Sequence, residues 1–110
     1  MIRWPAIGIL VLLSQSSAWA GDDDPATLVH EKRCDACHDI DKTLIGPPYR
    51  AIAARHAADK AVMIDVLAQK IIDGGGGNWG VVPMVPNEHV SFDEARRIAR
   101  WILDLDVSVN

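Results

Sequence analysis

The sequence has few of the large side chains that usually fill a protein interior. Its 110 residues include one phenylalanine, one tyrosine and four tryptophans, and aromatic residues make up 5% of the chain. Domains of this size normally bury more aromatic surface than these residues supply. A chain this short also buries only a modest core, which a crosslink, a metal or a cofactor commonly supports. We therefore expect another apolar group to occupy part of the interior.

Positive charge is in deficit as well. Eleven Lys and Arg residues stand against fifteen Asp and Glu residues, for a formal net charge of −4 at pH 7. Nucleic acids and anionic membrane surfaces attract proteins through clustered positive charge, which this composition does not provide. The composition therefore argues against both as partners.

No apolar run is long enough to span a bilayer. The longest covers residues 4–13, well short of the roughly 20 residues that a membrane-spanning helix needs. It follows the basic Arg3 and precedes Ala18-Trp19-Ala20, a small-x-small cleavage pattern. We predict a signal peptide over residues 1–20 and an exported, soluble domain over residues 21–110, without stable membrane insertion after cleavage. The alternative is an uncleaved amino-terminal membrane anchor.

Strand signals are missing too. No segment after the leader alternates polar and apolar residues over a sustained length, and no internal repeat is visible. Helix starts are instead marked by the capping residues Asp24, Asp59 and Ser91, and an Ala-rich helical segment runs over residues 49–57. We predict an all-α domain with three to four short helices. The apolar positions at helical spacing in the later helices are Met63, Val66, Leu67, Ile71, Ala95, Ile98, Ala99, Ile102 and Leu105.

Two segments carry neither helix nor strand signals. Residues 39–48 include the helix breaker Gly46-Pro47-Pro48, and residues 74–90 hold a run of glycines followed by prolines around a methionine. Long loops without secondary structure are uncommon in compact small domains and are usually functional. We expect both loops to have a functional reason to be ordered.

A cluster of cysteine and histidine lies in the stretch RCDACHDI, residues 33–40. Cys34 and Cys37 are the only cysteines, and His38 follows directly. A redox-active disulfide of the thioredoxin type would need a parallel sheet, for which the sequence has no strands. A zinc site would need a fourth ligand, normally from a second pair, and only isolated histidines are available. These are His30, His56 and His89.

Covalently attached haem is the third and best candidate, because Cys-x-x-Cys followed by His is its attachment signal. Cysteines three positions apart on a helical turn face one way, so both can form thioethers with the vinyl groups on one porphyrin edge. His38 can then reach the iron. A haem is also large, flat and apolar, which accounts for the scarcity of aromatic side chains. We predict one covalently attached haem c, held by Cys34 and Cys37, with His38 on the iron.

The second iron ligand is predicted in the long loop. Met84 lies between Pro83 and Pro86, whose restricted backbone would help to hold a thioether sulfur against the iron. Met63, in contrast, lies on the apolar face of a predicted helix and is assigned to the core. The other three histidines are interpreted as surface residues. His89 is the competing iron ligand, because it lies near the end of the same loop.

In this order and spacing, the motifs resemble the small class I c-type cytochromes of the cytochrome c-551 (c8) type, from bacterial respiratory chains. The resemblance runs from about Asp24 to Leu105 and rests on CDACH, DIDKTLIGPPYRAIAAR, DGGGGNWGVVPMVPN and SFDEARRIARWIL. It implies a small monohaem cytochrome c fold, in which short helices wrap around the haem. It also implies a periplasmic protein, and we expect a monomer.

The resemblance implies roles for individual residues. The backbone carbonyl of Pro47 would accept a hydrogen bond from the His38 ring and fix its tautomer. Trp79 would donate its indole N–H to a buried haem propionate, and Asn87 would form a hydrogen bond near the Met84 sulfur. The complete haem site implied in this way consists of Cys34, Cys37, His38, Pro47, Trp79, Met84 and Asn87, with His38 and Met84 as iron ligands.

Three positions depart from the family pattern. Lys70 stands where an arginine often binds a propionate, and lysine lacks the planar fork of arginine. His56 stands where an aromatic residue is common, and Val85 stands where a second proline often follows the methionine. None of the three is an iron ligand, so the departures bear on the redox potential and the partner surface.

The function implied by the resemblance is electron transfer rather than catalysis. With His38 and Met84 on the iron, no position is open to a substrate, and the soft thioether raises the redox potential. We expect a one-electron shuttle that docks transiently on larger redox proteins, such as a membrane cytochrome complex and a terminal reductase or oxidase. The alternative is a haem-based ligand sensor or a peroxidase-like protein, in which Met84 is displaceable.

Overall fold

Four α-helices and one short 3-10 helix make up the folded region of the computed structural model, which describes residues 1–12 and 24–108. These described residues contain no β-strand, and an isolated bridge pairs Gly75 with Met84. The prediction of an all-α domain with three to four short helices is confirmed. In chain order the elements are α1 (Pro25–Glu31), η1 (Cys34–Ala36), α2 (Tyr49–Arg55), α3 (Lys60–Asp73) and α4 (Phe92–Leu103).

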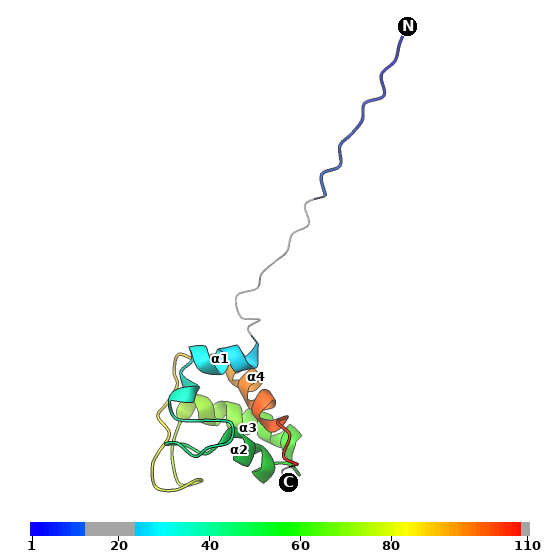
Figure 1. Cartoon of the computed structure of the whole chain (residues 1–110). Helices are drawn as coiled ribbons and strands as arrows, with labels where there is room; N and C mark the ends of the chain where they lie inside the picture. The colour runs from blue at the N-terminus through cyan, green and yellow to red at the C-terminus, as the bar shows by residue number, and fades with distance from the viewer. Residues whose placement is uncertain (13–23, 109–110) are drawn as a thin grey trace.

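The other α-helices are arranged around α4. It packs against α1, α2 and α3, and Figure 1 shows it between α1 and the lower pair of helices. Ala95 and Ala99 are fully buried on its inward face, together with Ile98 and Ile102, as the helical spacing predicted. Because the separation of packed helices depends on the side chains at the contact, the two alanines allow close approach to α4.

The start of α4 is fixed by reciprocal hydrogen bonds in its first turn. The backbone N–H of Glu94 donates to Oγ of Ser91 at 3.1 Å, and the backbone N–H of Ser91 donates to Oε1 of Glu94 at 3.0 Å. This is the predicted capping box, which satisfies two N–H groups at the helix end. The hydrogen bond from Ser91 and the nearby Lys32 ammonium lower the pKa of the Glu94 carboxyl.

Two of the predicted caps and one predicted core position are wrong. Asp24 and Asp59 precede α1 and α3, but neither side chain accepts a hydrogen bond from its helix. At α1 the backbone N–H of Leu28 donates to the backbone carbonyl of Asp24 at 2.9 Å. At α3 the first N–H groups donate to the backbone carbonyl of Asp59 instead. Val66 is 52% exposed because the fully buried position on α3 is Ala68.

One apolar cluster connects all four α-helices. Cys34 and Met84 are partly buried and pack against this cluster, although they come from segments far apart in the sequence. The cysteine turn and the long loop therefore rest on the same core. The buried members of the cluster are Leu28, Val29, Tyr49, Ala68, Ile71, Val90, Ala95, Ile98, Ala99 and Ile102.

The amino-terminal residues 1–12 form neither helix nor strand and extend away from the helical body (Figure 1). The predicted cleavage pattern at residues 18–20 lies outside the described residues. In the part of the chain that the structure describes, no helix is both long and apolar enough to cross a membrane.

The capping box yields a stability prediction. Ser91→Ala removes the side-chain acceptor at the start of the central helix, and we expect a loss of about 1 kcal/mol in the free energy of unfolding. Chemical denaturation followed by circular dichroism measures this loss. Thr27→Ala in α1 is the control, because Thr27 is exposed. Surface substitutions of this kind change the free energy of unfolding by no more than about 0.5 kcal/mol. Equal stability of the two variants would contradict the role given to the cap.

Candidate functional site

The cysteine cluster forms a single helical turn directly after α1. Arg33 adopts a left-handed conformation with φ of 65°, which changes the direction of the backbone after α1. The helix η1 begins at the next residue, Cys34. The carbonyl of Cys34 accepts hydrogen bonds from the backbone N–H groups of Cys37 at 3.2 Å and of His38 at 3.0 Å. Both cysteines are half-buried, and they are not joined to each other in a disulfide. The turn therefore presents two unlinked sulfurs and an imidazole from adjoining positions.

The environment of Cys34 favours the neutral thiol. Burial, followed by the neighbouring Asp35 carboxylate, raises the pKa of the Cys34 thiol. A raised pKa keeps the sulfur protonated at neutral pH, because burial and a nearby negative charge both disfavour a thiolate.

The imidazole of His38 is held in one orientation. Its Nδ1 lies 2.8 Å from the carbonyl oxygen of Pro47. Because a carbonyl oxygen can only accept, Nδ1 carries the hydrogen and the lone pair of the neutral ring is on Nε2. The ring stacks on Tyr49 with centroids 5.3 Å apart, and a Cβ atom at Gly46 would lie 2.5 Å from its Cε1. The lone pair of Nε2 is thus available to a metal.

The loop that carries Pro47 is fixed at both ends. Near its start, the backbone N–H of Gly46 donates to the carbonyl of Cys37 at 2.7 Å, and that of Tyr49 donates to the carbonyl of Asp39 at 2.9 Å. The Asp39 carboxylate accepts from the backbone N–H groups of Asp41 and Lys42, and these bonds lower its pKa. The partner of the His38 ring is therefore part of an ordered loop.

The Met84 loop is closed at its base by a pair of backbone hydrogen bonds. The N–H of Gly75 donates to the carbonyl of Met84 at 2.9 Å, and the reverse bond measures 2.8 Å. Gly74 has φ of 68°, and a Cβ atom there would lie 2.5 Å from the Met84 carbonyl oxygen. Glycine is therefore required at Gly74 both by backbone conformation and by space. This arrangement places the half-buried Met84 against the core.

Asn87 fastens the end of this loop to α3. Its side-chain Nδ2 donates to the carbonyl of Ile71 at 2.9 Å and to that of Val85 at 3.2 Å. Its backbone N–H donates to the carbonyl of Ile72 at 3.0 Å. Both N–H groups of the amide are thus engaged by backbone carbonyls, one of them next to Met84. The structure gives Asn87 an anchoring contact, whereas the resemblance implied one near the Met84 sulfur.

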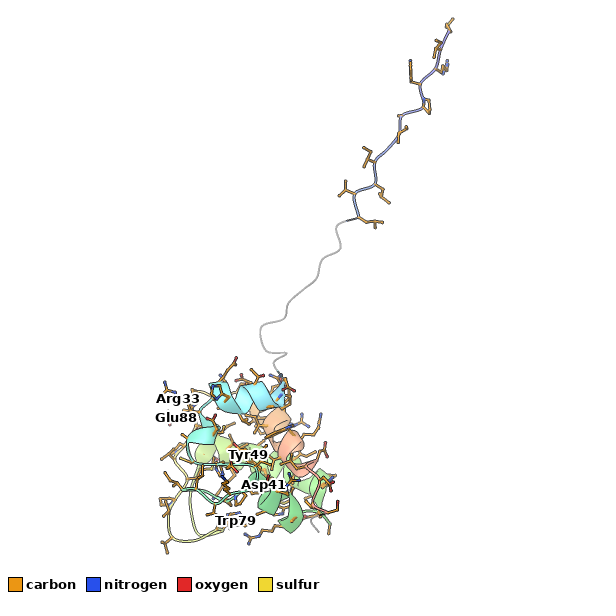
Figure 2. All side chains as sticks on the ribbon, in the orientation of Figure 1. Arg33, Asp41, Tyr49, Trp79 and Glu88 are labelled. Carbon is orange, nitrogen blue, oxygen red and sulfur yellow. The ribbon has the colours of Figure 1, made fainter. Side chains whose placement is uncertain are left out.

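Trp79 lies at the far end of the same loop, at the end of the helical body opposite α1 (Figure 2). It is 45% exposed, and the guanidinium carbon of Arg55 lies 4.6 Å from its ring centroid. Arg55 also donates from an N–H group to the carbonyl of Asn78 at 2.7 Å. Lys70 is half-buried near the base of the loop, where its ammonium lies close to Gly75.

His89, the competing iron ligand, is engaged elsewhere. Its Nε2 lies 3.2 Å from the carbonyl oxygen of Lys32, and the Lys32 ammonium lies 3.4 Å from the carbonyl oxygen of His89. His30 pairs with Asp35 at 2.6 Å, and this contact raises its pKa. Among residues 1–12 and 24–108, no three His, Cys, Asp or Glu side chains converge on a metal site, as zinc would require.

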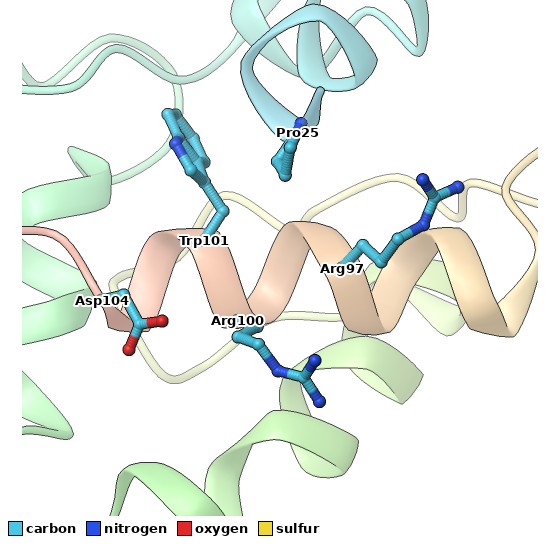
Figure 3. Close-up of a pocket in the computed structure, with 5 residues that line it drawn as sticks. All are labelled: Pro25, Arg97, Arg100, Trp101 and Asp104. Carbon is cyan, nitrogen blue, oxygen red and sulfur yellow. The ribbon is translucent and has the colours of Figure 1, made fainter. Parts of the chain in front are cut away.

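A surface groove of about 320 Å³ lies between the start of α1 and α4 (Figure 3). Trp101 contributes to it and also meets Tyr49 edge-on, with ring centroids 5.4 Å apart. None of its lining residues belongs to the predicted haem site, so the groove is separate from the cysteine turn. The residues that line it are Pro25, Arg97, Arg100, Trp101 and Asp104.

The residues around the cysteine turn fit a haem. The donor set consists of two free thiols, an imidazole nitrogen and a half-buried thioether. The Tyr49 hydroxyl is buried without a hydrogen-bond partner in the described part of the chain, and burial raises its pKa. The two loops also expose several large apolar side chains. The exposed apolar side chains of these loops are Ile40, Leu44, Ile45, Trp79, Val81, Val82 and Val85.

Sequence reasoning assigned no individual role to several residues that shape this site. Tyr49 and Gly46 confine the His38 ring, and Arg55 contacts the end of the Met84 loop. Gly46 and Tyr49 lie in the segment GPPY, which indicates a helix breaker and a helix start and is part of a motif that carries the family resemblance. No sequence signal points to Arg55, because its partners come from a loop rather than from a periodic element.

The sequence is similar to proteins of one known family. The family model described as cytochrome c matches residues 23–106. Cytochrome c-551 of Pseudomonas aeruginosa is 46% identical over 92 residues, covering 84% of each chain. Cytochrome c-552 of Hydrogenobacter thermophilus is 44% identical over 78 residues, covering 71% of this chain and 78% of that protein.

A solved structure agrees with the sequence relatives. The crystal structure of wild-type Nitrosomonas europaea cytochrome c552 matches with a TM-score of 0.70 and 42% identity, covering 74% of this chain and 99% of that one. The small class I cytochrome fold implied by the sequence is therefore confirmed. The chain belongs to the cytochrome c family, and its cofactor is one covalently attached haem c.

Proposed function

We propose that this protein carries single electrons between larger redox proteins, with haem c attached through Cys34 and Cys37 and its iron held between His38 and Met84. The observation that carries the proposal is the 2.8 Å contact between Nδ1 of His38 and the carbonyl oxygen of Pro47. A metal-binding histidine commonly donates its other ring N–H in this way, which fixes the ring and raises the basicity of the ligating nitrogen.

Met84 is proposed as the second ligand because its side chain is half-buried against the core and its backbone is paired with Gly75. When bound, haem supplies a one-electron iron couple, whose ferrous state is favoured by an uncharged thioether and by burial. With His38 and Met84 both holding the iron, little would have to move on electron transfer. The protein thus acts as a carrier and not as an enzyme.

Three further residues are proposed to support the haem. Pro47 orients the His38 ring through its carbonyl, and Asn87 holds the end of the Met84 loop on α3. Trp79 is proposed to donate its indole N–H to a haem propionate, since it is half-exposed and its ring is held by Arg55.

Partner docking is proposed on the loops that flank the cysteine turn. Residues 74–87 contain no charged side chain, and Val81, Val82 and Val85 are 98%, 62% and 68% exposed. Exposed apolar surface of this kind suits a small, transient interface. The partners proposed are a membrane cytochrome complex and a terminal reductase or oxidase. The mature monomer would meet them in the periplasm after removal of residues 1–20.

The ligand-sensing or peroxidase-like alternative is less well supported. It requires Met84 to leave the iron and, for peroxide chemistry, a second acid–base group beside it. His89 is the residue considered for that role, and its Nε2 lies against the carbonyl of Lys32 instead.

Met84→Ala tests the ligand assignment. We expect haem to stay attached while the iron opens to carbon monoxide and cyanide, with cyanide affinity at least about tenfold higher, as loss of a competing bond worth ~1.4 kcal/mol requires. Absorption spectra should also lose the weak red-region sulfur-to-ferric-iron band. Met63→Ala is the matched control and should keep the band. A Met84→Ala protein that excludes both ligands would show that the assignment is wrong.

Covalent attachment is tested by replacing the two cysteines together. Cys34→Ala with Cys37→Ala should abolish haem staining on a denaturing gel, since no sulfur remains to form a thioether. Each single variant should retain one thioether and stain. Haem that survives acid–acetone extraction from the double variant would contradict attachment at these residues.

Gly46→Ala tests how tightly the His38 ring is confined. The added Cβ would meet Cε1 at 2.5 Å and Nδ1 at 2.9 Å, so we expect a loss of about 1–3 kcal/mol in stability and an altered haem spectrum. Gly77→Ala is the control: its φ of 94° strains an alanine, but nothing lies within 4 Å of the new atom. An unchanged spectrum in Gly46→Ala would argue against the proposed orientation of the ligand.

A further inference from the structure

The segment between Gly75 and Met84 forms a closed loop whose two ends are held differently from its tip. At the base, Gly75 and Met84 exchange two backbone hydrogen bonds, and a Cβ atom at Gly76 would lie 3.2 Å from Pro83. The tip, residues 78–82, lies on the surface. Two glycines with positive φ, Gly77 and Gly80, flank Trp79 and give this part of the backbone freedom that other residues lack.

Arg55 is the side chain that connects this tip to the helical body. Its guanidinium carbon lies 4.6 Å from the centroid of the Trp79 ring, and an N–H group donates to the carbonyl of Asn78 at 2.7 Å. Arg55 is the last residue of α2, an end at which the helix dipole favours a cation. Within the described ranges, no carboxylate lies at ion-pair distance from Arg55. The guanidinium group therefore interacts with the loop through Trp79 and Asn78.

We propose that Arg55 is a positioning residue. Its contacts with Trp79 and Asn78, which we call the clasp, hold the tip of the Met84 loop against α2 and so limit displacement of Met84 from the haem iron. This inference rests on the proposed ligation by Met84. It adds a contact that restrains the loop at its tip, whereas Met84 lies at its base.

The physical basis is that Met84 lies at the base of the loop that Arg55 holds at its tip, so both sets of contacts restrain the same segment. The base is held by backbone hydrogen bonds and the tip by a charge-assisted hydrogen bond together with a cation–π contact. Removing the tip contacts leaves the backbone at Gly77 and Gly80 free to rearrange. The population of open loop conformers then rises, and an external ligand binds such conformers more readily.

The contact also depends on the shape of the guanidinium group. Its planar fork can lie over the indole ring and still direct an N–H group at the Asn78 carbonyl, whereas an ammonium is a point charge on a flexible stem. Arg55→Lys should therefore restore part of the effect. Trp79→Leu should weaken the clasp from the other side while leaving the Arg55 hydrogen bond in place.

The test measures imidazole binding to the ferric holoprotein, the red-region sulfur-to-iron band, and amide hydrogen exchange over residues 76–85. In Arg55→Ala we expect imidazole affinity to rise by about fivefold to thirtyfold, from loss of one cation–π contact and one charge-assisted hydrogen bond. Exchange over residues 76–85 should accelerate, and Arg55→Lys should lie between wild type and Arg55→Ala.

Arg96→Ala is the matched control, because it also removes one guanidinium from a helix. Arg96 pairs with Asp65 at 2.7 Å, between α4 and α3, and within the described residues it forms no hydrogen bond or ion pair with a loop residue. It should leave imidazole affinity and loop exchange at their wild-type values. The unfolding midpoint of each variant, measured with guanidinium chloride, separates a local effect from a global one.

The outcomes separate the clasp from the proposed function. A sulfur-to-iron band in wild type with unchanged imidazole affinity in Arg55→Ala would overturn the clasp and leave Met84 ligation intact. The clasp would also be overturned if Arg55→Ala and Arg96→Ala raised imidazole affinity equally. The same holds if imidazole affinity rose only in proportion to a lower unfolding midpoint. A wild-type protein without the sulfur-to-iron band would overturn both the ligation and the clasp.

Discussion

The hydrogen bond between the His38 ring and the Pro47 carbonyl determines which way the proposed iron ligand faces, and the rest of the site is built around it. Gly46 makes room for the ring, because a Cβ atom there would lie 2.5 Å from its Cε1, and Tyr49 covers one face of the ring. Tyr49 in turn meets Trp101 of α4 edge-on. The orientation of one imidazole is thus controlled from α2 and from the central helix of the domain.

The chemistry of the domain lies outside its α-helices. Every residue proposed to bind the haem belongs to η1 or to a loop, while α1 to α4 provide the apolar cluster beneath them and, at the end of α2, the positioning residue Arg55. Backbone polar groups in such loops need partners when they approach the core. Here the pairing of Gly75 with Met84 and the contacts of Asn87 supply these partners. A small set of short helices can therefore support two long, ordered loops.

Predictions based on local spacing succeeded at α4 and failed for the caps at Asp24 and Asp59 and for the core position Val66. The capping box at Ser91 and the apolar face of α4 are visible in a few consecutive residues. The exposure of Val66 and the uncapped start of α3 depend on how the helices pack, which spacing does not reveal. The contact between Arg55 and the loop joins residues 23 positions apart without a recurring pattern.

The same limit applies to the candidate site. The cysteine turn is a local motif, so the sequence alone could identify its residues. The two carbonyl partners of the Asn87 side chain become apparent only when the loop is placed against α3. The engagement of His89 by Lys32 likewise required the end of the loop to be placed beside α1.

The compactness of the cysteine turn has a consequence for the unfolded chain. Thioethers at Cys34 and Cys37 would survive denaturation because they are covalent bonds. They would restrict the unfolded ensemble very little, because they enclose only one turn of backbone. The iron would then remain tethered to a disordered chain in which Met84 has no preferred position. Histidines that are held elsewhere in the native fold, such as His89, would compete for the metal, and releasing them would become a step in refolding.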